Sequence, residues 1–249
     1  MEIVQSIERG FSILEYLAKQ SNGARITEIS QNVALTKGTV SRLLKTFIYL
    51  GYVEQATDSK YQLTFKLYEI ASQRMQNVDL VGIVQPLLLE MAKEINEVIH
   101  LVIRDGLFGV YVVKIEPNKS ITMNTSIGMR KKLCYTAYGK CLLLDTTKTE
   151  LENLWQASAV EKMTPFTITE FTEFYKEIEK TQKTGFAVDE QGVELDISCI
   201  SVPIRNHKKE IIAAVSISYV ANNISKKQLK NYQKIIVQYG EKISAQLGF

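Results

Sequence analysis

Four polar side chains in the last quarter of this sequence have types and spacing suited to binding or catalysis. Ser216 and Ser218 alternate with apolar residues, so both hydroxyls should lie on one face of a strand. Two hydroxyls so placed could bind one carboxylate or simply face solvent. Cys199 begins another apolar run, where a cysteine is either a small buried hydrophobe or a pocket group. Asp189 could orient the hydroxyls or a ligand, or end a strand in solvent.

His100 suggests an alternative function, because it lies within a β-prone run and could approach Cys199. One histidine and one cysteine are too few for a closed zinc site, which needs four ligands. The sequence shows neither a nucleophile–base–acid set nor a glycine-rich phosphate loop. We therefore expect a protein that is not an enzyme and that has no cofactor or metal. The alternative is a cysteine-based metal-binding sensor or enzyme with an accessory winged helix, which would show turnover or stoichiometric zinc.

A basic segment near the N-terminus predicts DNA binding. No acidic residue occurs between Glu28 and Glu54, and a helix over this segment would expose cations and hydroxyls opposite its apolar face. A helix of this kind enters the major groove in helix-turn-helix proteins. The predicted DNA contacts are Lys37, Gly38, Thr39, Ser41, Arg42 and Lys45, together with Lys60 at the tip of the following hairpin.

Arg42 has the fork geometry that recognises guanine, although it could equally hold a phosphate. Two short helices should precede the basic helix, the second capped by Thr27, and the basic helix itself should begin at Thr36. Two β-prone runs, Tyr52–Gln55 and Tyr61–Thr64, should form the wing hairpin. This order predicts a winged helix-turn-helix over residues 1–65 and a linker helix over 66–79. The alternative is a winged helix that contacts protein, which the acid-free basic face disfavours.

Residues 80–249 should form a larger domain with an antiparallel sheet and helices packed against it. The pattern predicts a helix opening around Pro86, since proline is best tolerated in a first helical turn. Strands and helices follow in an order typical of an α+β domain. The predicted strands are Val98–Arg104, Phe108–Ile115, Ile121–Ser126, Cys199–Arg205 and Ile211–Val220, and the last helix, Lys226–Leu247, should be capped by Ser225.

Short blocks along almost the whole chain resemble the IclR family (isocitrate lyase regulator type). In the first half these are Ser6-Ile7-Glu8-Arg9, Ile26-Thr27-Glu28-Ile29 and Thr39-Val40-Ser41-Arg42-Leu43-Leu44. In the second half they are Gly128-Met129-Arg130, Ala137-Tyr138-Gly139-Lys140, Gly185-Phe186-Ala187-Val188-Asp189, Cys199-Ile200-Ser201-Val202-Pro203 and Ala214-Val215-Ser216-Ile217-Ser218. Each block alone is weak, but they occur in the family's order.

The resemblance implies a GAF-like effector-binding domain, a homodimer or homotetramer, and a small-molecule effector such as a carboxylate or an aromatic acid. It implies a ligand site formed by Asp189, Cys199, Ser216 and Ser218, with backbone amides near Ala137 and Tyr138. The chain departs from the family pattern after Asp189, where Gln191-Gly192 and later Asp196 replace paired acids and a glycine. We expect this segment to bend differently.

Composition limits the location and the partners of the protein. The three cysteines, an odd number without a CxxC pair, indicate a reducing compartment. The N-terminus lacks the apolar stretch of a signal peptide, and no apolar run is long enough to span a bilayer. The sequence therefore predicts a cytoplasmic transcriptional regulator with no membrane contact. It should bind a double-stranded, palindromic operator with an affinity that a small metabolite modulates.

Overall fold

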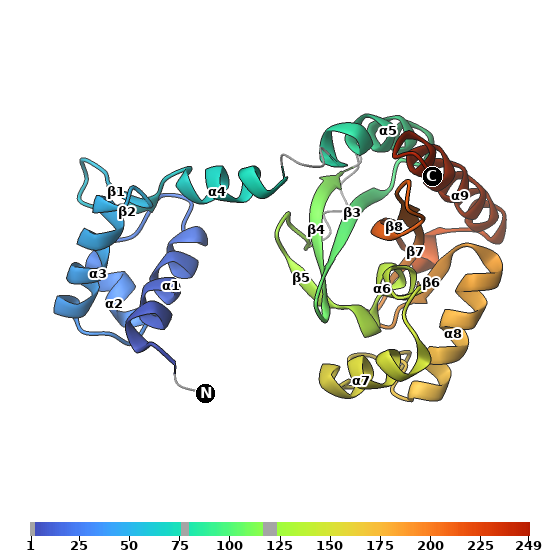
Figure 1. The fold of residues 1–249 in the computed structure, drawn as a ribbon, viewed down its shortest axis with the longest axis horizontal. Helices are drawn as coiled ribbons and strands as arrows, with labels where there is room; N and C mark the ends of the chain where they lie inside the picture. Colours follow the sequence, from blue (N-terminus) through green and yellow to red (C-terminus); the bar gives the residue numbers. More distant parts are fainter. Residues whose placement is uncertain (1–2, 76–79, 117–123) are drawn as a thin grey trace. The chain divides into compact units, whose positions relative to one another are not determined.

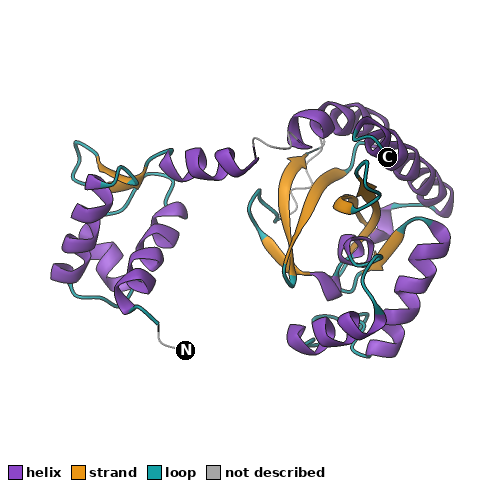
Figure 2. Cartoon of the chain, viewed as in Figure 1, coloured by secondary structure: helices purple, strands orange, loops and turns teal. Residues whose placement is uncertain are grey.

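The chain folds into two compact units, Met1–Asp79 and Leu80–Phe249, which we describe separately. The computed structural model describes residues 3–75, 80–116 and 124–249. Helices and strands are mixed in both units, so the fold class is α+β, as predicted (Figures 1 and 2).

The first unit has three helices, a two-stranded hairpin and a fourth helix. The apolar faces of the first three helices pack into one small core that includes Ile13, Ile29 and Leu44. The hairpin strands pair antiparallel, and an isolated bridge joins Ala24 to Tyr61 at the edge of the hairpin. The elements are α1 (Gln5–Ala18), α2 (Ile26–Asn32), α3 (Lys37–Tyr49), β1 (Val53–Gln55), β2 (Tyr61–Leu63) and α4 (Lys66–Met75).

The second unit is built on a six-stranded antiparallel sheet with the order β5-β4-β3-β8-β7-β6. Two helices, α5 and α9, lie on one face of the sheet, and α6, α7 and α8 lie on the other (Figure 1). The strands are β3 (Val98–Asp105), β4 (Phe108–Ile115), β5 (Arg130–Lys132), β6 (Ala187–Glu190), β7 (Ile197–Arg205) and β8 (Ile211–Val220). The helices are α5 (Leu80–Ile95), α6 (Ala137–Leu142), α7 (Lys148–Ser158), α8 (Phe171–Thr184) and α9 (Lys226–Gln246), with short 3-10 turns at Leu133–Tyr135 and Ala221–Asn223.

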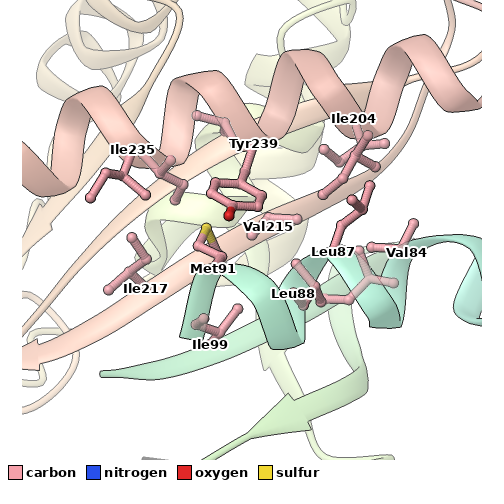
Figure 3. Close-up of a cluster of buried hydrophobic side chains, with 14 of the residues drawn as sticks. Val84, Leu87, Leu88, Met91, Ile99, Ile204, Val215, Ile217, Ile235 and Tyr239 are labelled. Carbon is pink, nitrogen blue, oxygen red and sulfur yellow. The ribbon is translucent and has the colours of Figure 1, made fainter. Parts of the chain in front are cut away.

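The larger core of this unit lies between the sheet and the pair α5 and α9. Figure 3 shows α5 side chains such as Leu88 and Met91 meeting Ile235 and Tyr239 of α9 and Ile217 of β8. These side chains are almost fully buried, which at about 25 cal/mol per Å² of apolar surface makes this core a main source of stability. The sheet is therefore held firmly from this side, while α6, α7 and α8 pack a second core against its other face.

Two predicted helix starts are wrong, and β7 begins two residues before the predicted Cys199. The helix expected to open around Pro86 begins at Leu80, so the proline lies in the helix interior. The buried stripe that includes Leu80, Val84 and Leu87 accounts for the longer helix. The cap of α2 is Arg25 rather than Thr27, and the Glu28 carboxylate accepts the Arg25 backbone N–H at 2.6 Å.

The predicted third strand, Ile121–Ser126, has its first three residues outside the described part of the chain. Its remaining residues, 124–126, are irregular rather than strand. The strand that pairs with β4 is instead β5, in which Lys131 lies opposite Gly109. Two short strands, β5 and β6, were not predicted as strands.

Candidate functional site

The outward face of α3 carries the predicted DNA-contacting residues. The helix begins as predicted at Thr36, whose side-chain oxygen accepts the Thr39 backbone N–H at 3.3 Å. Val40 and Leu44 are buried in the core, which turns the basic side of the helix outward. Lys37, Gly38, Arg42 and Lys45 are exposed, and Thr39 and Ser41 are half-buried. Among the described residues, none forms an ion pair with the Arg42 guanidinium or with either of these two lysines.

Lys60 lies where β1 and β2 are joined, but it has an intramolecular partner. Its ammonium group is 3.0 Å from the Asp58 carboxylate, and its backbone N–H also donates to Asp58. Ser59 beside it has φ 65°, a left-handed conformation that closes the turn. A DNA phosphate would therefore compete with Asp58 for the Lys60 side chain.

In the second unit, the strand register brings the predicted ligand residues together. Asp189 pairs with Cys199, and Cys199 pairs with Ser218, so the three lie side by side across β6, β7 and β8. Directly paired residues project to the same face of a sheet. Ser216 lies on the same face of β8 and pairs with His100 of β3. The Cys199 thiol is 3.2 Å from the Ser218 hydroxyl.

These side chains line a cavity of about 140 Å³ on the face of the sheet that α6 covers. An apolar cavity of about 150 Å³ holds a benzene molecule, so this one has room for a ligand of about six non-hydrogen atoms. All six residues predicted to contact a ligand are in its lining. The lining consists of His100, Tyr111, Asn124, Thr125, Lys131, Thr136, Ala137, Tyr138, Asp189, Val193, Glu194, Ile197, Cys199, Ser216 and Ser218.

Ala137 and Tyr138 reach the cavity because α6 begins there. Thr136 caps the helix by accepting the Gly139 backbone N–H at 3.0 Å. The N–H groups of Ala137 and Tyr138 precede the first intrahelical bond and have no acceptor within the described residues. Gly139 allows this close seating, because an added Cβ would overlap the carbonyl of Leu133.

Asp189 is a buried acid whose charge is only partly compensated. Burial raises the pKa of its carboxyl to about 6, although Lys140, the Gly192 backbone N–H and Lys131 all act in the opposite direction. The Gly192 N–H donates to Asp189 Oδ1 at 3.1 Å. The segment that follows bends back through left-handed residues at Gln191 (φ 60°) and Asp196 (φ 64°). This bend places Val193 and Glu194 over the cavity.

His100 and Cys199 share the cavity, but their surroundings disfavour the metal and nucleophile hypotheses. His100 Nε2 is 2.9 Å from the Thr125 hydroxyl, and burial together with Lys114 and Lys131 lowers the pKa of the imidazole to about 3. Burial and the neighbouring Asp189 raise the pKa of the Cys199 thiol to about 12, so it stays protonated at neutral pH. In the part of the chain that the structure describes, no group of three or more His, Cys, Asp or Glu side chains could hold a metal ion.

The sequence did not identify several residues of the cavity wall. Lys131 lines the cavity from β5 and has no ion-pair partner among the described residues, and Tyr111 does so from β4. β5 has only three residues, which is too short for an alternating pattern to be recognised in the sequence. Lys131 could therefore be assigned to the cavity only from the pairing of β5 with β4. Tyr111 lies in a predicted strand, but the register between β3 and β4 shifts between Leu101 and Val102. Simple alternation along the strand therefore could not show which face of the sheet Tyr111 is on.

No helix within the described ranges is both long and apolar enough to cross a membrane. Two family descriptions match the chain. Residues 6–57 match the "IclR helix-turn-helix domain", and residues 72–245 match "Bacterial transcriptional regulator IclR C-terminal".

Two full-length relatives are named as transcriptional regulators. The HTH-type transcriptional regulator XynR of Escherichia coli K12 is 32% identical over 250 residues, covering 100% of this chain and 99% of that protein. The HTH-type transcriptional regulator KdgR of the same organism is 34% identical over 247 residues, covering 99% of this chain and 94% of the relative.

Solved structures show the same fold. The Thermotoga maritima IclR is 30% identical and superposes with a TM-score of 0.84, with 98% of this chain and 99% of that chain covered. An IclR homologue from Microbacterium hydrocarbonoxydans complexed with 4-hydroxybenzoate also has a TM-score of 0.84, with 97% and 98% covered. Its identity of 18% supports likeness of fold alone.

Proposed function

The chain belongs to the IclR family of bacterial transcriptional regulators, and from this premise we propose that a small polar or anionic metabolite controls its affinity for an operator. Residues 1–65 would bind the operator, and 80–249 would bind the effector. Residues 66–79 would act as the linker; α4 covers Lys66–Met75 of it, and 76–79 lie outside the described residues. The regulator would act in the cytoplasm as a homodimer or homotetramer. Two recognition helices related by a two-fold axis would read a palindromic site.

The outward face of α3 supports the DNA-binding proposal. Arg42 is exposed on it, one turn beyond the capped helix start, without an ion-pair partner among the described residues. If Arg42 reads a base, Arg42→Ala should cost about 1–3 kcal/mol of operator binding and relax specificity at one position. If it holds a phosphate, the loss should be smaller and similar for all sequences.

The experiment measures binding to a promoter fragment of the neighbouring operon at several salt concentrations. Lys19→Ala is the matched control, because Lys19 is an exposed cation of the same unit outside α3. An affinity that is independent of salt and unchanged in Arg42→Ala would refute DNA reading by α3.

The cavity of the second unit supports the effector-binding proposal. The single observation that carries this proposal is that Ser216 and Ser218 lie in the cavity wall, in the company of Asp189 and Cys199. A hydrogen bond to a charged group contributes about 1.5–3 kcal/mol, so Ser218→Ala should weaken binding of an acid by about tenfold or more. Cys199→Trp should fill the cavity. The Microbacterium homologue, which shares the fold, is complexed with a carboxylate, 4-hydroxybenzoate, which is larger than the acid that this cavity would hold.

Calorimetric titration of acids selected by a thermal-shift screen tests this site. Ser198→Ala is the matched control, since Ser198 lies on β7 next to Cys199 but is absent from the cavity wall. Unchanged affinity in Ser216→Ala, Ser218→Ala and Cys199→Trp would place the site elsewhere.

Repeating the titration with operator DNA present tests the coupling. Linkage requires that DNA change effector affinity by the same factor as the effector changes DNA affinity, typically about 1–3 kcal/mol. A ligand that binds without this reciprocal effect would show that the second unit does not control DNA binding.

A further inference from the structure

Tyr138 contributes more to the cavity than the backbone amide that the sequence suggested. Tyr138 is a lining residue and is 3% exposed, and its hydroxyl lies near three other lining residues, Tyr111, Thr136 and Cys199, without a hydrogen-bond partner of ordinary geometry within the described residues. A buried polar group without a partner is costly and rare in folded proteins, and it calls for a functional explanation. We infer that the Tyr138 hydroxyl is a specificity determinant that hydrogen-bonds to a second oxygen of the effector, beyond its carboxylate. The inference rests on the proposed function of the cavity.

The ring of Tyr138 is held in position by its neighbours. Tyr111 meets it edge-on with ring centroids 5.6 Å apart, and His100 lies against Tyr111 at 4.7 Å. The ring also lies against the backbone of Gly109, where an added Cβ would overlap it. A hydroxyl on a ring packed in this way has little freedom to find another partner within the protein.

The nearby hydroxyls do not satisfy Tyr138. The hydroxyls of Tyr111 and Thr136 are near enough to the Tyr138 hydroxyl to interact with it weakly and to influence its pKa, but neither reaches the distance and angle of an ordinary hydrogen bond. Burial, with Tyr111 acting in the same direction, raises the pKa of Tyr138 well above its ordinary value. The phenol is therefore protonated at neutral pH and can donate a hydrogen bond to a ligand oxygen.

The rest of the lining indicates the kind of molecule that Tyr138 would recognise. Ser216 and Ser218 offer hydroxyls to a carboxylate, and Lys131 lines the same cavity without an ion-pair partner among the described residues. A volume of about 140 Å³ leaves room for a few atoms beyond a carboxylate. The ligand class is a small acid that carries a second oxygen, such as a hydroxyl, placed to accept from Tyr138.

Tyr138→Phe removes this hydroxyl and little else. Tyr239→Phe is the matched control, because the Tyr239 hydroxyl donates to Glu94 at 2.7 Å in the same unit, away from the cavity. In the ligand-free protein, Tyr138→Phe should unfold at the wild-type temperature or above it, since no hydrogen bond is lost. Tyr239→Phe should unfold at a lower temperature. A loss of stability in Tyr138→Phe as large as that in Tyr239→Phe would show that the hydroxyl is structural, and would overturn the inference.

Binding is then measured with two pairs of small acids that differ by one hydroxyl: lactate and propionate, and 3-hydroxybutyrate and butyrate. Wild-type protein should prefer the hydroxy acid in at least one pair, by about 2- to 12-fold for one ordinary hydrogen bond. Tyr138→Phe should bind both members of that pair equally, while Tyr239→Phe keeps the preference. Ser218→Ala should weaken both members and so reports on the proposed function separately.

Two outcomes would refute the assignment while the cavity remains a ligand site. One is wild-type protein that binds both members of every pair equally, and the other is Tyr138→Phe that keeps the wild-type preference. If no acid of the two pairs binds wild-type protein, the class of small hydroxy acid is wrong and this inference fails, whereas the proposed function is tested separately by the screen and titration described above.

Discussion

His100 and Asp189, on two strands that line one cavity, should affect stability in opposite directions as the pH changes. In the folded protein, burial and neighbouring lysines lower the pKa of His100 from 6.5 to about 3. Burial raises the pKa of Asp189 from 3.8 to about 6. We expect that the two contributions cancel between about pH 4 and 6, and that single variants reveal each one.

Whether each group stabilises or destabilises the protein on acidification depends on whether the folded or the unfolded state binds its proton more tightly. The unfolded chain protonates His100 first, so acidification from pH 6.5 to about 3 removes about 5 kcal/mol of stability. The folded chain protonates Asp189 first, so the stabilisation from this group is complete below pH 3.8. It is lost as the pH rises to about 6, a change of about 3 kcal/mol. Within its own window each group contributes about 1.4 kcal/mol per pH unit.

Urea unfolding of the ligand-free protein between about pH 4 and 6 measures both contributions. Trp155, the only tryptophan in the sequence, lies on α7 and reports on the second unit alone. Relative to wild type, Asp189→Asn should lose about 1.4 kcal/mol per unit of acidification, and His100→Gln should gain a similar amount. Differences from wild type remove the contribution of all other acids. Parallel curves for the three proteins would show that both side chains titrate normally, and that the cavity is hydrated rather than buried.

Three further predictions concern single positions. Gly139→Ala should lower the free energy of unfolding by about 1–3 kcal/mol, because the new Cβ overlaps the Leu133 carbonyl; urea unfolding at wild-type stability would contradict the tight seating of α6. Lys60→Ala should reduce the slope of log K for operator binding against log salt by about one unit, and loss of sequence discrimination with an unchanged slope would mean that the wing reads bases instead. Thr36→Ala should cost about 1 kcal/mol in the stability of the first unit, measured by thermal unfolding, and no change would show that the cap at α3 is unimportant.

Helix starts could be predicted where a hydroxyl side chain directly precedes the helix and accepts a backbone N–H. Thr36 and Ser225 both accept a backbone N–H three residues later, as their sequence contexts indicate. Thr27 has the right residue type but lies inside α2, because the Glu28 carboxylate binds the backbone N–H of Arg25 and starts the helix earlier. Because Arg25 is not a typical cap residue, the sequence left the first residue of α2 ambiguous by one or two positions.

The cavity residues on β7 and β8 could be proposed from alternation and family resemblance, because strand periodicity fixes the face of each side chain. Tyr111 and Lys131 could not, since their placement depends on a β-bulge and on a three-residue strand. The unpaired hydroxyl of Tyr138 was also out of reach, because a missing partner is a property of the packed structure. The sequence indicated only the backbone at that position.

β8 divides its residues between two tasks, and this division bears on how the protein could be redesigned as a biosensor. Ser216 and Ser218 face the cavity, whereas Val215 and Ile217 belong to the core against α5 and α9. A library that randomises only Ser216 and Ser218 would change the proposed site without disturbing the packing that keeps the scaffold folded, whereas Ala214, although also even-numbered, is part of the core. Val215 and Ile217 would tolerate little variation. If the proposed site binds the effector, its preference could therefore change through two residues of β8 while their neighbours Val215 and Ile217 stay almost unchanged.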